Sequence, residues 1–437
     1  MFSIKIRSFI FSLLVIFFSC SCYDGIPRRG TLLFKSLDYN SRLTIKFAKN
    51  ITKKMKVKFF RKISFTPIAY NVFGYDIAEY NHRLYILEKN MDNYVKNALL
   101  SEKIKFIKFN VETKFGSEES AINKKRNIKK GNLTWQERLF DLKRSVKFIK
   151  NNKIRFKKYG VVMVDTAPDF NHQDIKKVIK YYNGKPLYWL SKSLKSNKVF
   201  DEHGTFISCL ATGYRYKKWS ADSYILPIIV RFGLNIEDSY LSDIAIGLKY
   251  YLELEKKGIV EFKVVNMSFM SHNNLGILHD AMEAMSDKLF VVASGNRFAD
   301  DSSIAVSDIY PASWRLENKL TVTGINKLGV LSEDSKADHN YVDIASPIEE
   351  RSCIVSGKNK DYKVLVGTSI STAIVSWGAN ILFSAYPDLS IDQIRLSMIW
   401  GAKRNHNLTL MVDQGRVFNL YQSLEYARLF QYFSSQE

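Results

Sequence analysis

The sequence predicts an α/β fold, in which a doubly wound, mostly parallel sheet carries helices on both faces and follows a small α+β domain. Short apolar runs that end abruptly in polar residues support the large domain: GVVMVD, KVVNMS, KLFVVASGN and KLTVTG. Unbroken hydrophobicity of this kind is typical of strands buried on both faces. Helical patterns at 243–254 and 278–285 separate some of these runs, as in strand–helix–strand units.

Composition places the chain among globular proteins. Its 437 residues are 46% hydrophobic and 25% charged, which excludes a disordered chain and allows one large core plus an accessory domain. The excess of 65 Lys and Arg over 43 Asp and Glu gives a net charge of +22. The lysines are spread through stretches such as KVKFFRKISF, and we find no RNP-like, zinc-finger or helix-turn-helix motif. A solvated Lys-rich surface is therefore favoured over a nucleic-acid partner.

The first 22 residues predict export. Lys5 and Arg7 precede a near-apolar run at 9–18, and small residues follow it. This run of 10 residues is shorter than the ~20 that a membrane-spanning helix needs, so segment 1–22 is interpreted as a signal peptide. The stretch FFSC resembles a loose lipobox of bacterial lipoproteins. Two alternatives stay open: a lipid anchor at Cys20 on the outside of a membrane, or signal cleavage and secretion.

Two segments separate the signal peptide from the large domain. Alternating runs at 43–47, 56–60 and 104–109 predict strands, and a helical pattern lies at 91–100, so residues 23–113 form the small α+β domain. Residues 114–132 are polar and carry two basic clusters, 124–126 and 129–130, which indicates an exposed linker. The large domain spans 133–437.

Chemically active side chains recur at the ends of the predicted strands. Asp165, Ser268 and Asn296 each follow an apolar run, and functional residues of such sheets gather beyond the carboxyl ends of the strands. His203 precedes an amphipathic helix, and Ser369 opens an apolar helix at 370–385 that Pro387 ends. Each residue alone has an ordinary structural explanation: a turn, a buried histidine or a helix cap.

Together these residues have one chemical logic. A serine hydroxyl becomes a nucleophile when a neutral imidazole takes its proton, and a buried Asp fixes the tautomer of that imidazole. Asn296 and the Ser369 backbone N–H would supply hydrogen bonds to a tetrahedral oxyanion. The constellation therefore predicts acyl transfer through an acyl-enzyme.

The order Asp, His, Ser resembles that of the subtilisin-like serine proteases. Similar blocks run in the same order from about 135 to 424: VVMVDTAPDFNHQDI, HGTFISCLATG, VVNMSF, VVASGN with YPAS, VGTSISTAIVSWGANIL and GRVFNLYQSL. The resemblance implies the catalytic residues Asp165, His203 and Ser369, with Asn296 in the oxyanion hole. It also implies protein or peptide substrates and a substrate-binding set: Ser268, Phe269, Met270, Ala293, Ser294 and Gly295.

The resemblance bears on cofactors and on the first domain too. The chemistry requires no cofactor, whereas structural calcium is frequent in the family and no ligands for it can be identified in this sequence. Domain 23–113 has the position and size of the family's self-inhibiting propeptide. A permanent accessory domain is the alternative.

Several residues depart from the family pattern. Ala167 and Trp377 stand where the family has Gly, Phe206 replaces a second His, and Ala373 and Ile374 replace Pro and His. Met270 replaces a Gly that lets the substrate backbone approach. None of these changes removes a catalytic group, so we expect an effect on substrate choice more than on chemistry.

Two functions follow from these observations. The first is an exported serine endopeptidase. The alternative is a catalytically silent surface binding protein on the same scaffold, with the cleft blocked by Met270 or by a retained first domain. Cys209 and Cys353 form either a disulfide outside the cytoplasm or two buried thiols.

Overall fold

The computed structural model describes most of the large domain and parts of the region before it. The described residues are 42–47, 52–53, 55–56, 65–73, 75–80, 104–110, 134–191, 202–213, 223–230, 241–272, 274, 276–297, 303–354 and 362–435. The chain divides into two compact units, Met1–Val111 and Glu112–Glu437. The signal peptide with Cys20, the helix expected at 91–100 and the linker 114–132 lie outside the described residues.

The first unit contains a four-stranded antiparallel sheet in the order β2-β3-β1-β4. Its strands are β1 (Arg42–Phe47), β2 (Phe65–Val72), β3 (Tyr75–Tyr80) and β4 (Ile104–Asn110). The runs at 43–47 and 104–109 are strands as expected, whereas the β2–β3 hairpin was not foreseen. The strand expected at 56–60 is wrong at Lys56, which is helical. Thr52 caps that turn by accepting the Met55 N–H, and local capping outweighs the alternating pattern there.

The second unit is built on a nine-stranded sheet in the order β16-β17-β13-β12-β11-β10-β5-β9-β8. All its pairings are parallel except that of β16 with β17, and the central strands are almost entirely buried. The predicted mostly parallel sheet is therefore confirmed. The strands are β5 (Gly160–Asp165), β8 (Trp189–Leu190), β9 (Tyr224–Ile229), β10 (Phe262–Met267), β11 (Leu289–Ala293), β12 (Lys319–Ile325), β13 (Ile344–Pro347), β16 (Lys403–Arg404) and β17 (Arg416–Val417).

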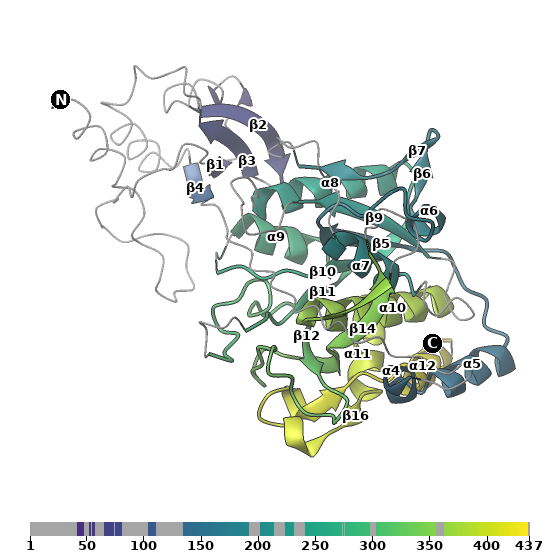
Figure 1. The fold of residues 1–437 in the computed structure, drawn as a ribbon. Coiled ribbons are helices and arrows are strands. Elements are labelled where there is room, and N and C mark those ends of the chain that lie inside the picture. Colours follow the sequence, from purple (N-terminus) through teal and green to yellow (C-terminus); the bar gives the residue numbers. More distant parts are fainter. Residues whose placement is uncertain are drawn as a thin grey trace. The chain divides into compact units, whose positions relative to one another are not determined.

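Helices cover both faces of this sheet (Figure 1). On one face, α8 (Leu241–Lys256) packs against α9 (Gly276–Ala284), and on the other α7 (Glu202–Ala211) packs against α10 (Thr368–Ala385). Every residue of α10 is buried, which explains why apolar residues occur on every side of the helix. The remaining helices are α4 (Trp135–Leu139), α5 (Leu142–Asn151), α6 (Ile175–Val178), α11 (Ile391–Trp400), α12 (Leu420–Ser434), and the 3-10 turns η4 (His406–Leu408) and η5 (Asp413–Gly415).

An antiparallel hairpin of β14 (Glu349–Cys353) and β15 (Tyr362–Val366) leads directly into α10, and a smaller one pairs β6 (Tyr181–Tyr182) with β7 (Lys185–Pro186). Cys353 at the end of β14 forms a disulfide with Cys209 of α7, with 6.2 Å between their Cα atoms. Of the two alternatives for these cysteines, the structure therefore shows the bonded one. The disulfide joins residues 144 positions apart in the sequence.

Within the described part of the chain, no helix combines the length and the apolar character needed to cross a membrane.

Candidate active site

Asp165 and His203 form a buried hydrogen-bonded pair. Asp165 is the last residue of β5 and is 1% exposed, and its Oδ1 lies 2.7 Å from His203 Nδ1. The same oxygen accepts the backbone N–H of Thr166 at 2.7 Å. Because an ionised carboxylate only accepts hydrogen bonds, Nδ1 carries the imidazole proton and Nε2 keeps its lone pair. This tautomer is the one that a general base needs.

A glycine lets the helix with His203 approach the end of β5. The Gly204 N–H donates to Thr166 Oγ1 at 2.9 Å, and a Cβ at this position would lie 2.1 Å from the Thr166 carbonyl oxygen. Any side chain would therefore push α7 away from β5. The Gly after His203 is thus a requirement of the Asp165–His203 distance.

Helix α10 begins at Thr368, two positions before the expected start at 370, so Ser369 is its second residue. Its hydroxyl donates to the Ser268 carbonyl oxygen at 3.2 Å, and Ser268 Oγ donates to the Ser369 carbonyl oxygen, also at 3.2 Å. Two hydrogen bonds therefore join Ser268, the residue after β10, to Ser369 at the start of α10. The first four N–H groups of a helix have no partner within it, so the Ser369 N–H is placed to serve a ligand.

Asn296 is held in one orientation beside Ser369. Its Oδ1 accepts the Thr368 backbone N–H at 2.9 Å and the Thr368 hydroxyl at 2.8 Å. Since both partners are donors, the oxygen must face them, and the amide Nδ2 is the group left to donate. Asn296 thus presents a fixed hydrogen-bond donor next to the residue that precedes Ser369.

A supporting chain of hydrogen bonds was only partly foreseen. Asn266, in the buried strand β10, donates from Nδ2 to Ser268 Oγ at 2.8 Å, and its Oδ1 accepts the Ser376 hydroxyl at 2.9 Å. An Asn inside the otherwise apolar run VVNM signals such a buried network, because an unpaired amide there would be costly. The roles of Ser376, Thr166 and Thr368 have no comparable signal in the sequence.

The residues expected to bind substrate lie at the ends of the neighbouring strands β10 and β11. Met270 is 8% exposed, and its Sδ would lie 2.9 Å from a Cβ on Gly295, whose φ of +106° favours glycine. Met270 therefore covers the backbone next to Asn296. Ser294 directs its hydroxyl to the Lys336 carbonyl oxygen at 2.7 Å, while Phe269 and Ala293 are buried.

Four departures from the family pattern are buried, and the one at Trp377 has a packing explanation. The Trp377 ring fills space beside Gly213, where a Cβ would lie 2.1 Å from its Nε1. Gly213 follows the end of α7 with φ +64°, a conformation that favours glycine. Because Gly213 has no side chain, there is room for Trp377 of α10. Phe206 is fully buried in the core, as are Ala373 and Ile374 at 0% and 1% exposure.

Two groups of ligand-type side chains occur among the described residues: His172, Cys209 and Cys353, and His279, Asp280 and Glu283. Within each group the ligand atoms lie within 4.8 Å of one another. Calcium takes six to eight oxygen ligands, which neither group supplies. Neither group is therefore a calcium site, and the calcium that the resemblance allows has no identified ligands in these two groups.

Comparisons with known proteins bear on the family and the fold of this chain. The family model described as the subtilase family, Peptidase_S8, matches residues 157–417. The chain is 27% identical over 239 residues to subtilisin-like protease 3 of Plasmodium falciparum, in a match that covers 50% of this chain and 30% of that protein. The chain therefore spans less than a third of that relative's length.

Solved structures share the fold. Fervidolysin from Fervidobacterium pennivorans, a keratinolytic enzyme related to subtilisin, has a TM-score of 0.64 at 14% identity, covering 88% of this chain and 61% of its own. A chain of the subtilase cytotoxin SubAB has a TM-score of 0.55 at 19% identity, covering 70% of this chain and 99% of its own. With the family model matching more than half of its length, the chain belongs to the subtilase family, whose members are serine peptidases.

Proposed function

We propose that this protein is an exported serine endopeptidase that cleaves peptide bonds with Asp165, His203 and Ser369. The observation that carries the proposal is the 2.7 Å contact between Asp165 Oδ1 and His203 Nδ1. It leaves Nε2 as the basic nitrogen of a ring that is 11% exposed, while the carboxylate is almost fully buried. Such a pair both orients the imidazole and stabilises the imidazolium that forms during reaction.

We propose the following reaction steps for these groups. His203 Nε2 takes the proton of Ser369 Oγ as this oxygen attacks the carbonyl carbon of the scissile bond. The resulting oxyanion accepts hydrogen bonds from Asn296 Nδ2 and from the Ser369 N–H. When the C–N bond breaks, His203 gives its proton to the leaving amine. Water, deprotonated by the same nitrogen, then releases the acid and restores Ser369.

The remaining parts of the proposal concern the ends of the chain. The basic and apolar start of the sequence supports export, and FFSC supports a lipid at Cys20. We propose that the first unit is a propeptide which occupies the cleft until it is cut away. The match to fervidolysin covers 88% of this chain, which is more than the second unit alone contains, so it also includes part of the first unit.

A silent binding protein is the second candidate, and Met270 is the observation that favours it. This side chain lies over Gly295, where the family pattern leaves backbone open to substrate. If it blocks every peptide, the triad would have no substrate. The retention of all four catalytic groups makes the peptidase the better proposal.

The proposal is tested by digestion of a mixed peptide library, with products sequenced by mass spectrometry. The full chain and its Ser369→Ala variant are compared after secretion. Cleavage at defined positions by the wild type alone supports the peptidase. If a folded wild type with its first unit removed yields the same peptides as the variant, the silent scaffold becomes the better account. A shortened mature chain would also reveal self-processing.

A further inference from the structure

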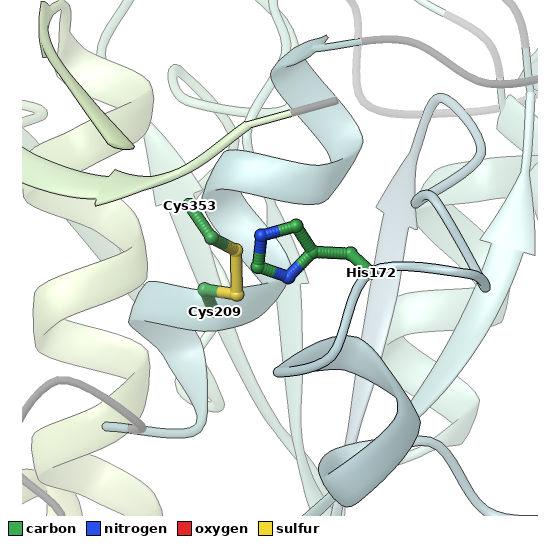
Figure 2. Close-up of side chains that lie close together, drawn as sticks. All are labelled: His172, Cys209 and Cys353. Atoms are coloured by element: carbon green, nitrogen blue, oxygen red, sulfur yellow. A yellow bond between two sulfur atoms is a disulfide. The ribbon is translucent and has the colours of Figure 1, made fainter. Parts of the chain in front are cut away.

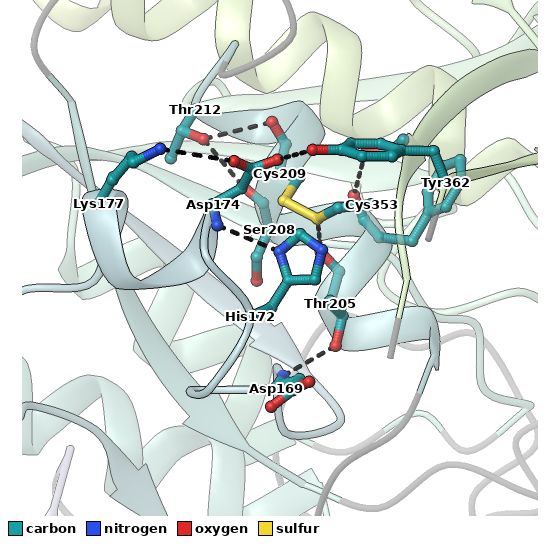
Figure 3. Close-up of a disulfide and its surroundings, with 12 residues drawn as sticks. Asp169, His172, Asp174, Lys177, Thr205, Ser208, Cys209, Thr212, Cys353 and Tyr362 are labelled. Atoms are coloured by element: carbon teal, nitrogen blue, oxygen red, sulfur yellow. Dashed lines mark hydrogen bonds and ion pairs between the residues drawn. A yellow bond between two sulfur atoms is a disulfide. The ribbon is translucent and has the colours of Figure 1, made fainter. Parts of the chain in front are cut away.

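The disulfide between Cys209 and Cys353 lies where three chain segments meet (Figure 3). Each segment is close in the sequence to one of the proposed catalytic residues. Cys209 is on α7, six residues after His203, and Cys353 is on the β14–β15 hairpin that leads into Ser369. The third segment follows Asp165 and contributes His172, which packs edge to face with Tyr362 of β15. The covalent bond therefore joins the histidine and serine segments, and the aspartate segment packs against it.

Hydrogen bonds connect the same three segments. Thr205 Oγ1 of α7 accepts the Asp169 N–H at 2.8 Å, and Ser352 of β14 donates to the Phe206 carbonyl oxygen at 3.0 Å. Tyr362 donates to Asp174. These contacts are individually weak compared with the disulfide, because each exchanges a bond to water for a bond within the protein. The disulfide is the strongest restraint on the hairpin.

His172 directs an unused N–H toward the disulfide. The ring is fully buried, and its Nδ1 accepts the Asp174 backbone N–H at 3.2 Å, so the neutral ring carries its proton on Nε2. This Nε2 is buried without a hydrogen-bond partner. Figure 2 shows the edge of the ring that contains Nε2 turned toward the two sulfur atoms. A protonated nitrogen is not a metal ligand, so this arrangement favours thiol chemistry over a metal site.

The His172 N–H and the Thr205 carbonyl oxygen both interact better with two reduced cysteines than with a disulfide. Disulfide sulfurs have no proton to donate and accept hydrogen bonds weakly, whereas a thiolate is a strong acceptor for the His172 N–H. Cys353 Sγ also lies 3.3 Å from the Thr205 carbonyl oxygen, a distance at which a thiol S–H can donate. Reduction would therefore give a partner to an N–H that has none in the bonded form.

We propose that Cys209–Cys353 is a redox-labile switch that restrains the triad when closed, and that His172 favours its opening. A thiolate of a dithiol reductant attacks one sulfur and forms a mixed disulfide, and its second thiol then displaces that sulfur. Two electrons and two protons pass to the cysteines, and the reductant leaves as a cyclic disulfide. Opening removes the covalent link between the hairpin and α7 and lowers the reactivity of Ser369. This last effect rests on the proposed function.

The lability is tested without reference to activity. The full chain is equilibrated in buffers of reduced and oxidised dithiothreitol, and free thiols are alkylated and counted by intact mass. His172→Asn keeps an acceptor near the Nδ1 position and lacks the Nε2 donor, while His172→Gln restores a donor near Nε2. We expect His172→Asn to need a roughly tenfold higher ratio of reduced to oxidised dithiothreitol, the effect of about one charge-assisted hydrogen bond, and His172→Gln to recover part of it. Equal midpoints for wild type and His172→Asn would overturn the role of His172.

The effect on the triad is tested by the rate at which a fluorophosphonate labels Ser369. We expect labelling to slow severalfold in the reduced chain and in the Cys209→Ala/Cys353→Ala double variant, and to recover in the wild type on reoxidation. Equal rates in the oxidised and reduced chains, with both confirmed by mass, would overturn the switch. Absence of labelling in both would refute the proposed peptidase instead, and the thiol titration would still decide the lability.

Discussion

The Thr368 N–H and hydroxyl both donate to Oδ1 of Asn296, at 2.9 and 2.8 Å, and this fixes the amide beside the proposed nucleophile. A side chain held by two donors needs no reorganisation when an oxyanion forms at its Nδ2. The residue before Ser369 thus orients the group proposed to stabilise the product of Ser369 attack.

Asn296→Ala is expected to lower kcat by about 10²–10³-fold while KM changes little, because the donor acts mainly in the transition state. That range comes from the equivalent donor in subtilisin, a member of this family. Steady-state kinetics on a cleaved peptide measure the effect. Asn380→Ala is the matched control, since this buried Asn of α10 donates to Ser223 instead. Near-normal kcat in Asn296→Ala would remove Asn296 from the mechanism.

Met270→Gly is expected to widen substrate choice. In the wild type the Met270 side chain covers Gly295, so small residues before the cleaved bond should be preferred. We expect kcat/KM for peptides with Phe at that position to rise roughly tenfold or more, and for peptides with Ala to change much less. Paired peptides that differ only at this residue give the comparison. An equal change for both would show that Met270 does not limit this subsite.

Gly213→Ala is expected to destabilise the protein through Trp377. The new Cβ would lie 2.1 Å from the Trp377 Nε1, at a φ of +64° that disfavours side chains. We expect Gly213→Ala to lower the free energy of unfolding by about 2–3 kcal/mol. In a chain that already carries Trp377→Gly, we expect Gly213→Ala to cost only about 1 kcal/mol, the part that comes from the backbone. Denaturant unfolding of the two single variants and the double variant measures this coupling. Additive losses would contradict the contact.

Burial lowers the pKa of Lys319 to about 8, because the folded interior disfavours the charged form more than Asp343 favours it. Below pH 8 the amine is charged in both states, and its burial opposes folding. Between pH 8 and about 10.5 the unfolded chain binds more protons than the folded one, so this group's contribution to stability improves as pH rises.

The Lys319→Met variant isolates that contribution. We expect the stability of the variant minus that of the wild type to be largest below pH 8 and to decrease as the pH rises toward 10.5. Urea titrations at several pH values give the two curves. Parallel curves over this window would mean that Lys319 titrates normally in the folded protein.

Much of the large domain could be predicted because its signals are local. GVVMVD and VVNMS are apolar enough to require burial on both faces, and this alone indicates parallel strands. The pairing of Asp165 with His203 was predicted from the chemistry of an activated serine together with the resemblance to the subtilisin-like proteases. Gly204 belongs to the block HGTFISCLATG, and the structure shows that its lack of a side chain lets α7 approach β5.

Other features depend on contacts between distant residues and left no readable pattern. The disulfide required the distance between α7 and β14, which spacing along the chain does not provide. Met270 is unusual in the sequence because it replaces a Gly of the family pattern, but only the fold shows that its Sδ lies against Gly295. Lys56 became helical because Thr52 caps its turn, a local effect that the alternating pattern concealed.

Fluorophosphonate labelling of the secreted chain, read by intact mass, shows whether Ser369 is an activated nucleophile. We expect one adduct on the wild type and none on Ser369→Ala or His203→Ala. No adduct on a folded wild type whose first unit has been removed, or an adduct that persists in Ser369→Ala, would contradict that role of Ser369.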